Sequence, residues 1–133
     1  MTGGVTGGAV PIDVVAAVIR DDQGRMLIGR RPAEKRHGGL WEFPGGKVDP
    51  GESHRDAMAR ELAEELSLTL VSMAERPVFG RVDEGGAFRI LFYDVEVRGV
   101  PVAHEHSELF CGLADQLAPM PLAPSDAAFV AWL

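Results

Sequence analysis

Residues 46–68 read GKVDPGESHRDAMARELAEELSL, and this stretch predicts a helix with two chemically different sides. Ser53 is a good helix N-cap, and Asp56 three residues later provides a weak version of the capping box. We therefore predict a helix over residues 54–66. Its apolar side, expected to pack against a sheet, consists of Ala59, Leu62, Ala63 and Leu66.

The other side of the predicted helix is acidic. Glu61, Glu64 and Glu65 stand at positions i, i+3 and i+4, which brings their carboxylates onto one face. They lie toward the helix C-terminus, where the helix dipole disfavours negative charge, so the cluster costs stability unless a cation binds it. A hard divalent cation with oxygen ligands meets that need. The alternative is a solvated acidic face without a ligand.

A glycine pair precedes this helix. Gly45 and Gly46 let the backbone approach a ligand closely, so that a carbonyl can bind a metal or an amide can contact a phosphate. An ordinary turn also contains such a pair. Arg60 stands directly before the first glutamate of the cluster and can hold neighbouring carboxylates by paired hydrogen bonds. Glu52 is the other charged residue at a fixed spacing from the cluster.

These residues resemble the Nudix box, a pattern of Gly, five residues, Glu, seven residues, Arg-Glu, an aliphatic, any residue, Glu-Glu, any residue, Gly and an aliphatic. The matching residues are Gly46, Glu52, Arg60, Glu61, Leu62, Glu64, Glu65 and Leu68. Ser67 departs from the pattern, because the family has a glycine there that usually ends the helix. If the position needs a positive φ, serine should cost about 1 kcal/mol or less.

The resemblance extends beyond the box. The stretches LWEFPGGK (residues 40–47), GRRP (29–32) and PLAPSD (121–126) are similar to the MutT-type pyrophosphohydrolases of the family. The stretch AHEH (103–106), followed by PLAPSD, is closer to the bacterial CTP pyrophosphohydrolase branch. Of all these stretches, only the box is highly specific for the family.

The resemblance implies an enzyme that uses Mg²⁺ or Mn²⁺ to hydrolyse a nucleoside triphosphate to a monophosphate and pyrophosphate. CTP, modified cytosine nucleotides and 8-oxo-dGTP all remain open as substrates. The implied metal ligands are the Gly45 carbonyl and the carboxylates of Glu61, Glu64, Glu65 and Glu105. Glu52 and Arg60 would brace these ligands. Either Glu61 or Glu105 would be the general base, and the alternative for Glu105 is a surface loop acid.

The substrate-binding residues implied by the resemblance are Arg31, Phe43, Gly46, Lys47 and Asp126. Arg31 matches a phosphate-contacting arginine, although an exposed arginine at a strand end is the alternative. Asp126 stands where the family reads the edge of the base, or it is simply the N-cap of the last helix. Phe43 or Trp41 would stack on the base, with core packing as the alternative.

The rest of the chain predicts strands interrupted by helices. The predicted strands are residues 12–20 and 25–31, which together would form a hairpin, and residues 40–43, 78–82, 88–97 and 109–113. A last helix is predicted over residues 125–133, with its N-cap at Ser125 or Asp126. The fold class is α+β: the Nudix fold, a mixed β-sheet sandwiched between helices (α/β/α), over residues 11–133 after a flexible tail at residues 1–10.

Composition limits the partners. The 133 residues carry a net charge of −7, which argues against binding long nucleic acid, whereas a small phosphorylated substrate remains compatible through a bound cation. No stretch is apolar enough for a membrane. The single cysteine, Cys111, is compatible with a reducing cytoplasm and is predicted to be a small buried hydrophobe. Monomer and homodimer both remain open.

Other function classes make different predictions. Hydrolases of ADP-ribose or dinucleoside polyphosphates share the box, so the box does not separate them from a triphosphate hydrolase. A non-catalytic Nudix module that only binds nucleotides would be expected to lack box glutamates, and this sequence has all of them. A structural acidic interaction domain would bind no divalent cation at all.

Overall fold

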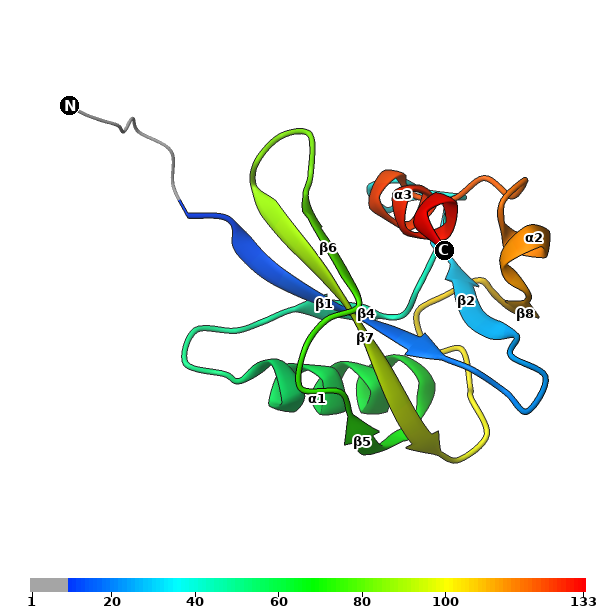
Figure 1. The fold of residues 1–133 in the computed structure, drawn as a ribbon, viewed down its shortest axis with the longest axis horizontal. Helices are drawn as coiled ribbons and strands as arrows, with labels where there is room; N and C mark the ends of the chain where they lie inside the picture. Colours follow the sequence, from blue (N-terminus) through cyan, green and yellow to red (C-terminus); the bar gives the residue numbers. More distant parts are fainter. Residues whose placement is uncertain (1–9) are drawn as a thin grey trace.

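The computed structural model describes residues 10–133 as two β-sheets and three helices (Figure 1). The strands are β1 (Ile12–Ile19), β2 (Met26–Arg30), β3 (Trp41–Glu42), β4 (Gly45–Lys47), β5 (Thr69–Met73), β6 (Phe79–Val82), β7 (Phe88–Arg98) and β8 (Glu108–Gly112). The helices are α1 (His54–Leu66), α2 (Ala114–Leu117) and α3 (Pro124–Trp132). The tail predicted at residues 1–10 lies outside the described residues except for Val10.

A five-stranded mixed sheet has β1 in its interior. β1 pairs in parallel with β7 and antiparallel with β4, while β7 pairs antiparallel with β5 and β6. Both faces of β1 are covered: Val15 and Ala17 pack in a core with α1, and Ala16 and Val18 pack in a second core with α3. The sheet is therefore enclosed between α1 on one side and α3 on the other, as the predicted α+β class requires (Figure 1).

The predicted hairpin of residues 12–20 and 25–31 is wrong. β2 lies in a separate three-stranded sheet, β3-β2-β8, and only an isolated bridge between Arg20 and Met26 connects it to the end of β1. The continuous apolar run of β1 suits a strand covered on both faces and paired in parallel, and the partner of such a strand comes from elsewhere in the chain. β4, β5 and α2 were not predicted.

Helix α1 begins and ends at the predicted residues. The Ser53 hydroxyl accepts a hydrogen bond from the Asp56 amide at 3.0 Å, which confirms the N-cap. The buried face differs from the prediction: Ala57 and Met58 are buried together with Leu62 and Leu66, whereas Ala63 is exposed. The buried face thus extends closer to the N-terminus of the helix than predicted.

Two smaller predictions also fail. α3 begins at Pro124 and its N-cap is Ala123, so neither Ser125 nor Asp126 caps it; proline suits the first helical turn because its missing N–H has no partner there anyway. Cys111 is exposed, because it lies on β8 at an edge of the three-stranded sheet. None of the helices within residues 10–133 has the length and apolar character needed to cross a bilayer.

Candidate active site

Two glycines bring the backbone close to both β1 and α1. A Cβ atom at Gly45 would lie 1.9 Å from the Val15 carbonyl oxygen, and the φ of Gly45 is +152°. A Cβ atom at Gly46 would lie 1.9 Å from Oε2 of Glu61. Gly45 therefore requires glycine, whereas a side chain at Gly46 would displace the carboxylate of Glu61.

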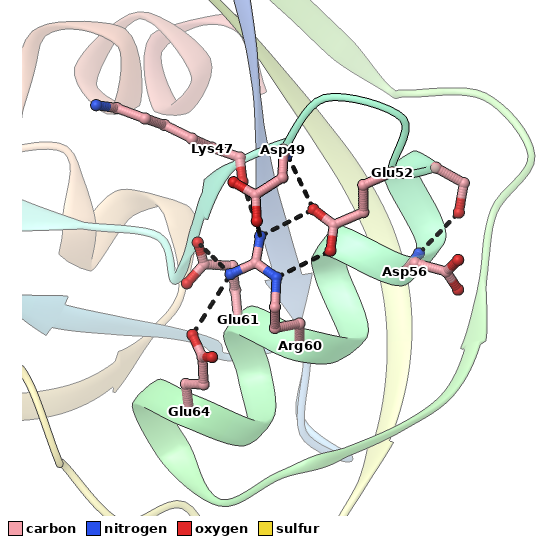
Figure 2. Close-up of polar contacts among 8 residues, drawn as sticks. Lys47, Asp49, Glu52, Asp56, Arg60, Glu61 and Glu64 are labelled. Carbon is pink, nitrogen blue, oxygen red and sulfur yellow. Dashed lines mark hydrogen bonds and ion pairs between the residues drawn. The ribbon is translucent and has the colours of Figure 1, made fainter.

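Arg60 holds the loop before α1 by a set of hydrogen bonds (Figure 2). Its Nε and Nη2 donate to the two carboxylate oxygens of Glu52, both at 2.9 Å, and Nη2 also donates to the Lys47 carbonyl at 3.0 Å. Glu52 accepts a further bond from the Asp49 amide at 3.0 Å. The hydrogen bonds from Arg60 lower the pKa of Glu52 to about 2, so Glu52 is ionised and its oxygens are already occupied. This geometry suits the supporting role predicted for Glu52 and Arg60, which is to hold the metal ligands in position.

The three glutamates of α1 lie in different environments. Nη1 of Arg60 is 3.4 Å from one oxygen of Glu61 and 3.4 Å from one oxygen of Glu64, as Figure 2 shows. The Glu64 side chain is 56% exposed, against 15% for Glu61. Glu65 is more buried still, at 4% exposure. The acidic face predicted from spacing therefore runs from solvent into the protein.

Glu65 is a buried acid with an unsatisfied carboxyl oxygen. Within residues 10–133 its Oε1 is buried and has no hydrogen-bond partner. Burial raises the pKa of Glu65, and the negative charges of Glu61, Glu42 and Glu105 raise it further. Burial is also the main cause of the raised pKa of Glu61. Desolvated carboxylates that face one another are stabilised by a proton or by a bound cation.

A cavity of about 180 Å³ opens beside Glu65. It is lined by Arg31, Pro32, Lys35, Glu42, Gly45, Glu65, Glu105 and His106. Four residues predicted from sequence (Arg31, Gly45, Glu65 and Glu105) thus meet here, whereas neither Glu61 nor Glu64 lines the cavity. In the part of the chain that the structure describes, no three His, Cys, Asp or Glu side chains form a ready cation cage. The unpartnered oxygen of Glu65, among further oxygens, still fits a hard divalent cation.

Sequence reasoning missed Glu42 and His106. Glu42 accepts a hydrogen bond from Nη1 of Arg31 at 2.9 Å, and its other oxygen lies 2.9 Å from Nε2 of His106. His106 is buried, and a Cβ atom at Gly29 would lie 2.5 Å from its ring. Both residues belong to stretches that carried the family resemblance, LWEFPGGK and AHEH, but no local pattern indicated that they meet.

A larger cavity of about 460 Å³ adjoins the first, sharing Arg31, Glu42 and Gly45 with it. This volume falls within the usual range of small-ligand sites. All the residues predicted to bind substrate line it: Arg31, Phe43, Gly46, Lys47 and Asp126. The Lys47 ammonium lies 5.2 Å from the centre of the Phe88 ring, which also lines the cavity.

Asp126 is a buried carboxylic acid that lines the larger cavity. It is 9% exposed, and its Oδ1 accepts a hydrogen bond from the Phe43 amide at 2.8 Å. Burial raises the pKa of Asp126 to about 8, and the nearby charge of Glu42 acts in the same direction. At neutral pH the carboxyl group is therefore mostly protonated, so it can both donate and accept a hydrogen bond.

The aromatic residues suggested for base stacking pack in the core. Phe43 is 3% exposed and meets Phe92 and Phe129 edge to face, at 5.7 and 5.2 Å between ring centres. Trp41 is 9% exposed and contacts Phe110 edge to face. Core packing, the alternative interpretation, therefore accounts for both rings, although Phe43 also lines the larger cavity.

Comparison with known proteins gives consistent matches over nearly the whole chain. The NUDIX domain model matches residues 10–133. CTP pyrophosphohydrolase of Escherichia coli strain K12 is 41% identical over 120 residues, covering 86% of this chain and 85% of that protein. A putative 8-oxo-dGTP diphosphatase 2 of Mycobacterium tuberculosis is 35% identical over 125 residues, covering 90% and 85%. A solved MutT structure, from a study of Aliivibrio salmonicida and Vibrio cholerae, has a TM-score of 0.79 at 30% identity and covers 92% and 95%.

Proposed function

Since this chain belongs to the Nudix family, we propose that it hydrolyses a nucleoside triphosphate to a nucleoside monophosphate and pyrophosphate. One observation carries the proposal: an acidic cavity with an unpartnered carboxylate oxygen adjoins a cavity of small-ligand size. The two cavities share Arg31, Glu42 and Gly45, so one ligand can reach into both. A triphosphate joined to a nucleoside matches that arrangement.

The smaller cavity and the adjoining face of α1 are the proposed place of the chemistry. Glu61, Glu65 and Glu105, with the Gly45 carbonyl, would hold Mg²⁺ or Mn²⁺, and Glu64 would contribute from the exposed side. Such a cation, when bound, neutralises charge on the phosphoryl oxygens. Arg31 would contact a phosphate, and either Glu61 or Glu105 would take the proton of the attacking water. Glu52 and Arg60 would keep the helix and the glycine loop in place.

The larger cavity would receive the nucleoside. Asp126, protonated at neutral pH, can donate to a ring nitrogen while accepting from an exocyclic amine, which suits the pairing edge of cytosine. CTP or a modified cytosine nucleotide is therefore our first candidate, in line with the 41% identity to the CTP pyrophosphohydrolase. The second candidate is 8-oxo-dGTP, because a relative named for it is 35% identical.

A nucleotide panel with Mg²⁺ tests the proposal. We expect wild-type protein to release pyrophosphate and monophosphate, and Glu61→Gln to lose about a hundredfold to a thousandfold in turnover. Glu75→Gln, an exposed acid outside both cavities, is the matched control and should behave like wild type. Equal turnover by wild type and Glu61→Gln would reject the assignment of α1. Orthophosphate as the main product would mean that the protein cleaves a different bond of the triphosphate.

The net charge of −7 and the single cysteine support two further parts of the proposal: free nucleotides as partners rather than long nucleic acid, and a cytoplasmic place of action. Light scattering on the purified protein decides between monomer and homodimer. A filter-binding assay with duplex DNA at low salt checks the first part, with no retention expected.

A further inference from the structure

The segment that carries Glu105 is anchored on both sides by backbone hydrogen bonds. The His104 amide donates to the Glu65 carbonyl at the end of α1, at 3.0 Å. The Ser107 amide donates to the Arg30 carbonyl at the end of β2, also at 3.0 Å. Glu105 therefore lies on a short bridge from the helix to the three-stranded sheet, where it lines the smaller cavity together with Glu65.

Side chains tie down both neighbours of Glu105. His106 is held by Glu42, at 2.9 Å between Nε2 and a carboxylate oxygen. His104 is held by Ser67, with 2.6 Å between the hydroxyl oxygen and Nε2. Because both neighbours are fixed, the backbone at Glu105 is held beside Glu65, and its exposed side chain extends from that fixed point.

Ser67 is an unusual residue for its place. It follows α1 in the left-handed conformation, with φ of 57° and ψ of 31°, and its amide donates to the Ala63 carbonyl at 3.1 Å. Glycine adopts this conformation without a steric penalty, and serine does not. The positive φ confirms the condition under which serine was expected to cost stability. The hydroxyl group that serine has and glycine lacks is the group that contacts His104.

We propose that Ser67 is a positioning residue that acts through His104 to hold Glu105 opposite Glu65 and so strengthens divalent-cation binding. The inference rests on the proposed function, because it takes Glu105 to be a metal ligand. It predicts that replacing Ser67 by glycine weakens cation binding without lowering stability.

Ser67→Gly is the informative variant. Glycine relieves the left-handed strain, so the melting temperature of the metal-free protein should stay the same or rise by up to about 4 °C. Loss of the contact should raise the Mn²⁺ dissociation constant about tenfold, measured by electron paramagnetic resonance with α,β-imido-CTP present. His104→Ala should weaken Mn²⁺ binding to the same degree. Ser67→Asn, which tolerates the left-handed conformation and keeps a polar side chain, should recover part of the affinity.

Two comparisons make the test decisive. Ser72→Ala removes another serine hydroxyl, one bonded to Glu96 on β7, and should leave Mn²⁺ binding unchanged. In a Glu105→Gln background, Ser67→Gly should have no further effect on Mn²⁺ binding, because its partner in the effect is already gone. A full tenfold loss in that background would overturn the proposal. Wild-type affinity in both Ser67→Gly and His104→Ala would overturn it too, while hydrolysis by wild type would leave the proposed function standing. A wild type that neither hydrolyses nucleotides nor binds Mn²⁺ would instead reject the proposed function, and this inference with it.

Discussion

The two cavities each bury a carboxyl group, and they differ in what lies around it. The pKa of Asp126, in the larger cavity, is raised to about 8 mainly by burial, and the charge of Glu42 adds to the shift. Glu65, in the smaller cavity, is surrounded by Glu61, Glu42 and Glu105. A proton is enough for the first group, but a cluster of acids can also be neutralised by one divalent cation. The neighbours of a buried acid therefore decide between a hydrogen-bonding group and a cation site.

Replacing the acid of the smaller cavity should have the largest effect. Glu65→Gln should lower turnover about a hundredfold to a thousandfold, because an oxygen that faces the proposed cation is lost. The same variant should be more stable than wild type without metal, since the amide removes a desolvated carboxylate from a group of acids. Pyrophosphate release and thermal denaturation in the presence of a chelator measure the two effects. A drop in both would mean that Glu65 supports the fold instead.

Glu42 belongs to both cavities, so its replacement should affect both. Glu42→Gln breaks the ion pair with Arg31 and alters the bond to His106. We expect kcat/KM to fall about tenfold to a hundredfold, less than for Glu65→Gln, because Glu42 orients other groups rather than facing the phosphate. Steady-state kinetics on CTP and 8-oxo-dGTP should show similar losses. A loss confined to one base would place Glu42 in recognition of the nucleoside.

Asp126→Asn should change the response of stability to pH. The pKa of Asp126 is about 8 in the folded protein against 3.8 in the unfolded chain, so between these values the folded state binds the extra proton. Stability of the wild type should therefore fall as pH rises from about 4 to about 8 and level off above that range. The asparagine variant should lack this contribution, as urea denaturation at several pH values would show. Equal pH profiles for the two proteins would mean that Asp126 is ionised.

Asp126→Ala should shift base preference about tenfold while leaving Mn²⁺ affinity unchanged, because both the donor and the acceptor proposed to face the base are removed. Competition between CTP and the other triphosphates measures the preference. A uniform loss across all bases would contradict the assignment of Asp126 to the nucleoside.

Cys111→Ser should have the smallest effect. The thiol is exposed on β8 and lines neither cavity, so stability should change by less than about 0.5 kcal/mol and turnover should not change. Urea denaturation and pyrophosphate release check both. A clear loss of turnover would extend the site to β8.

Local patterns were enough to predict α1, because its N-cap, its charges and its length all lie within one short stretch. They were not enough for contacts between distant segments. Glu42 and His106 meet only after β3 and the segment before β8 have been placed on β2, and nothing near either residue indicates the other. Arg31 and Glu105 were named from resemblance, and the structure puts both beside the smaller cavity.

The strand pattern shows the same limit. A strand was predicted over residues 12–20, and β1 confirms it. Its partner was predicted to be the next strand along the chain, whereas β7 and β4 are its neighbours in the sheet. An alternating or continuous pattern reports which faces of a strand are covered, but it carries no information about the strand with which it pairs.

The parallel pairing of β1 with β7 has a consequence for how the protein is made. Asp13 and Arg89, which face each other in this pair, are 76 positions apart in the chain. As the chain leaves the ribosome, β1 therefore emerges well before β7, the strand with which it pairs in parallel. Until β7 has been synthesised, the unpaired N–H and C=O groups of this apolar strand are open to other chains. Slow translation or crowded overexpression should therefore favour aggregation of the nascent protein.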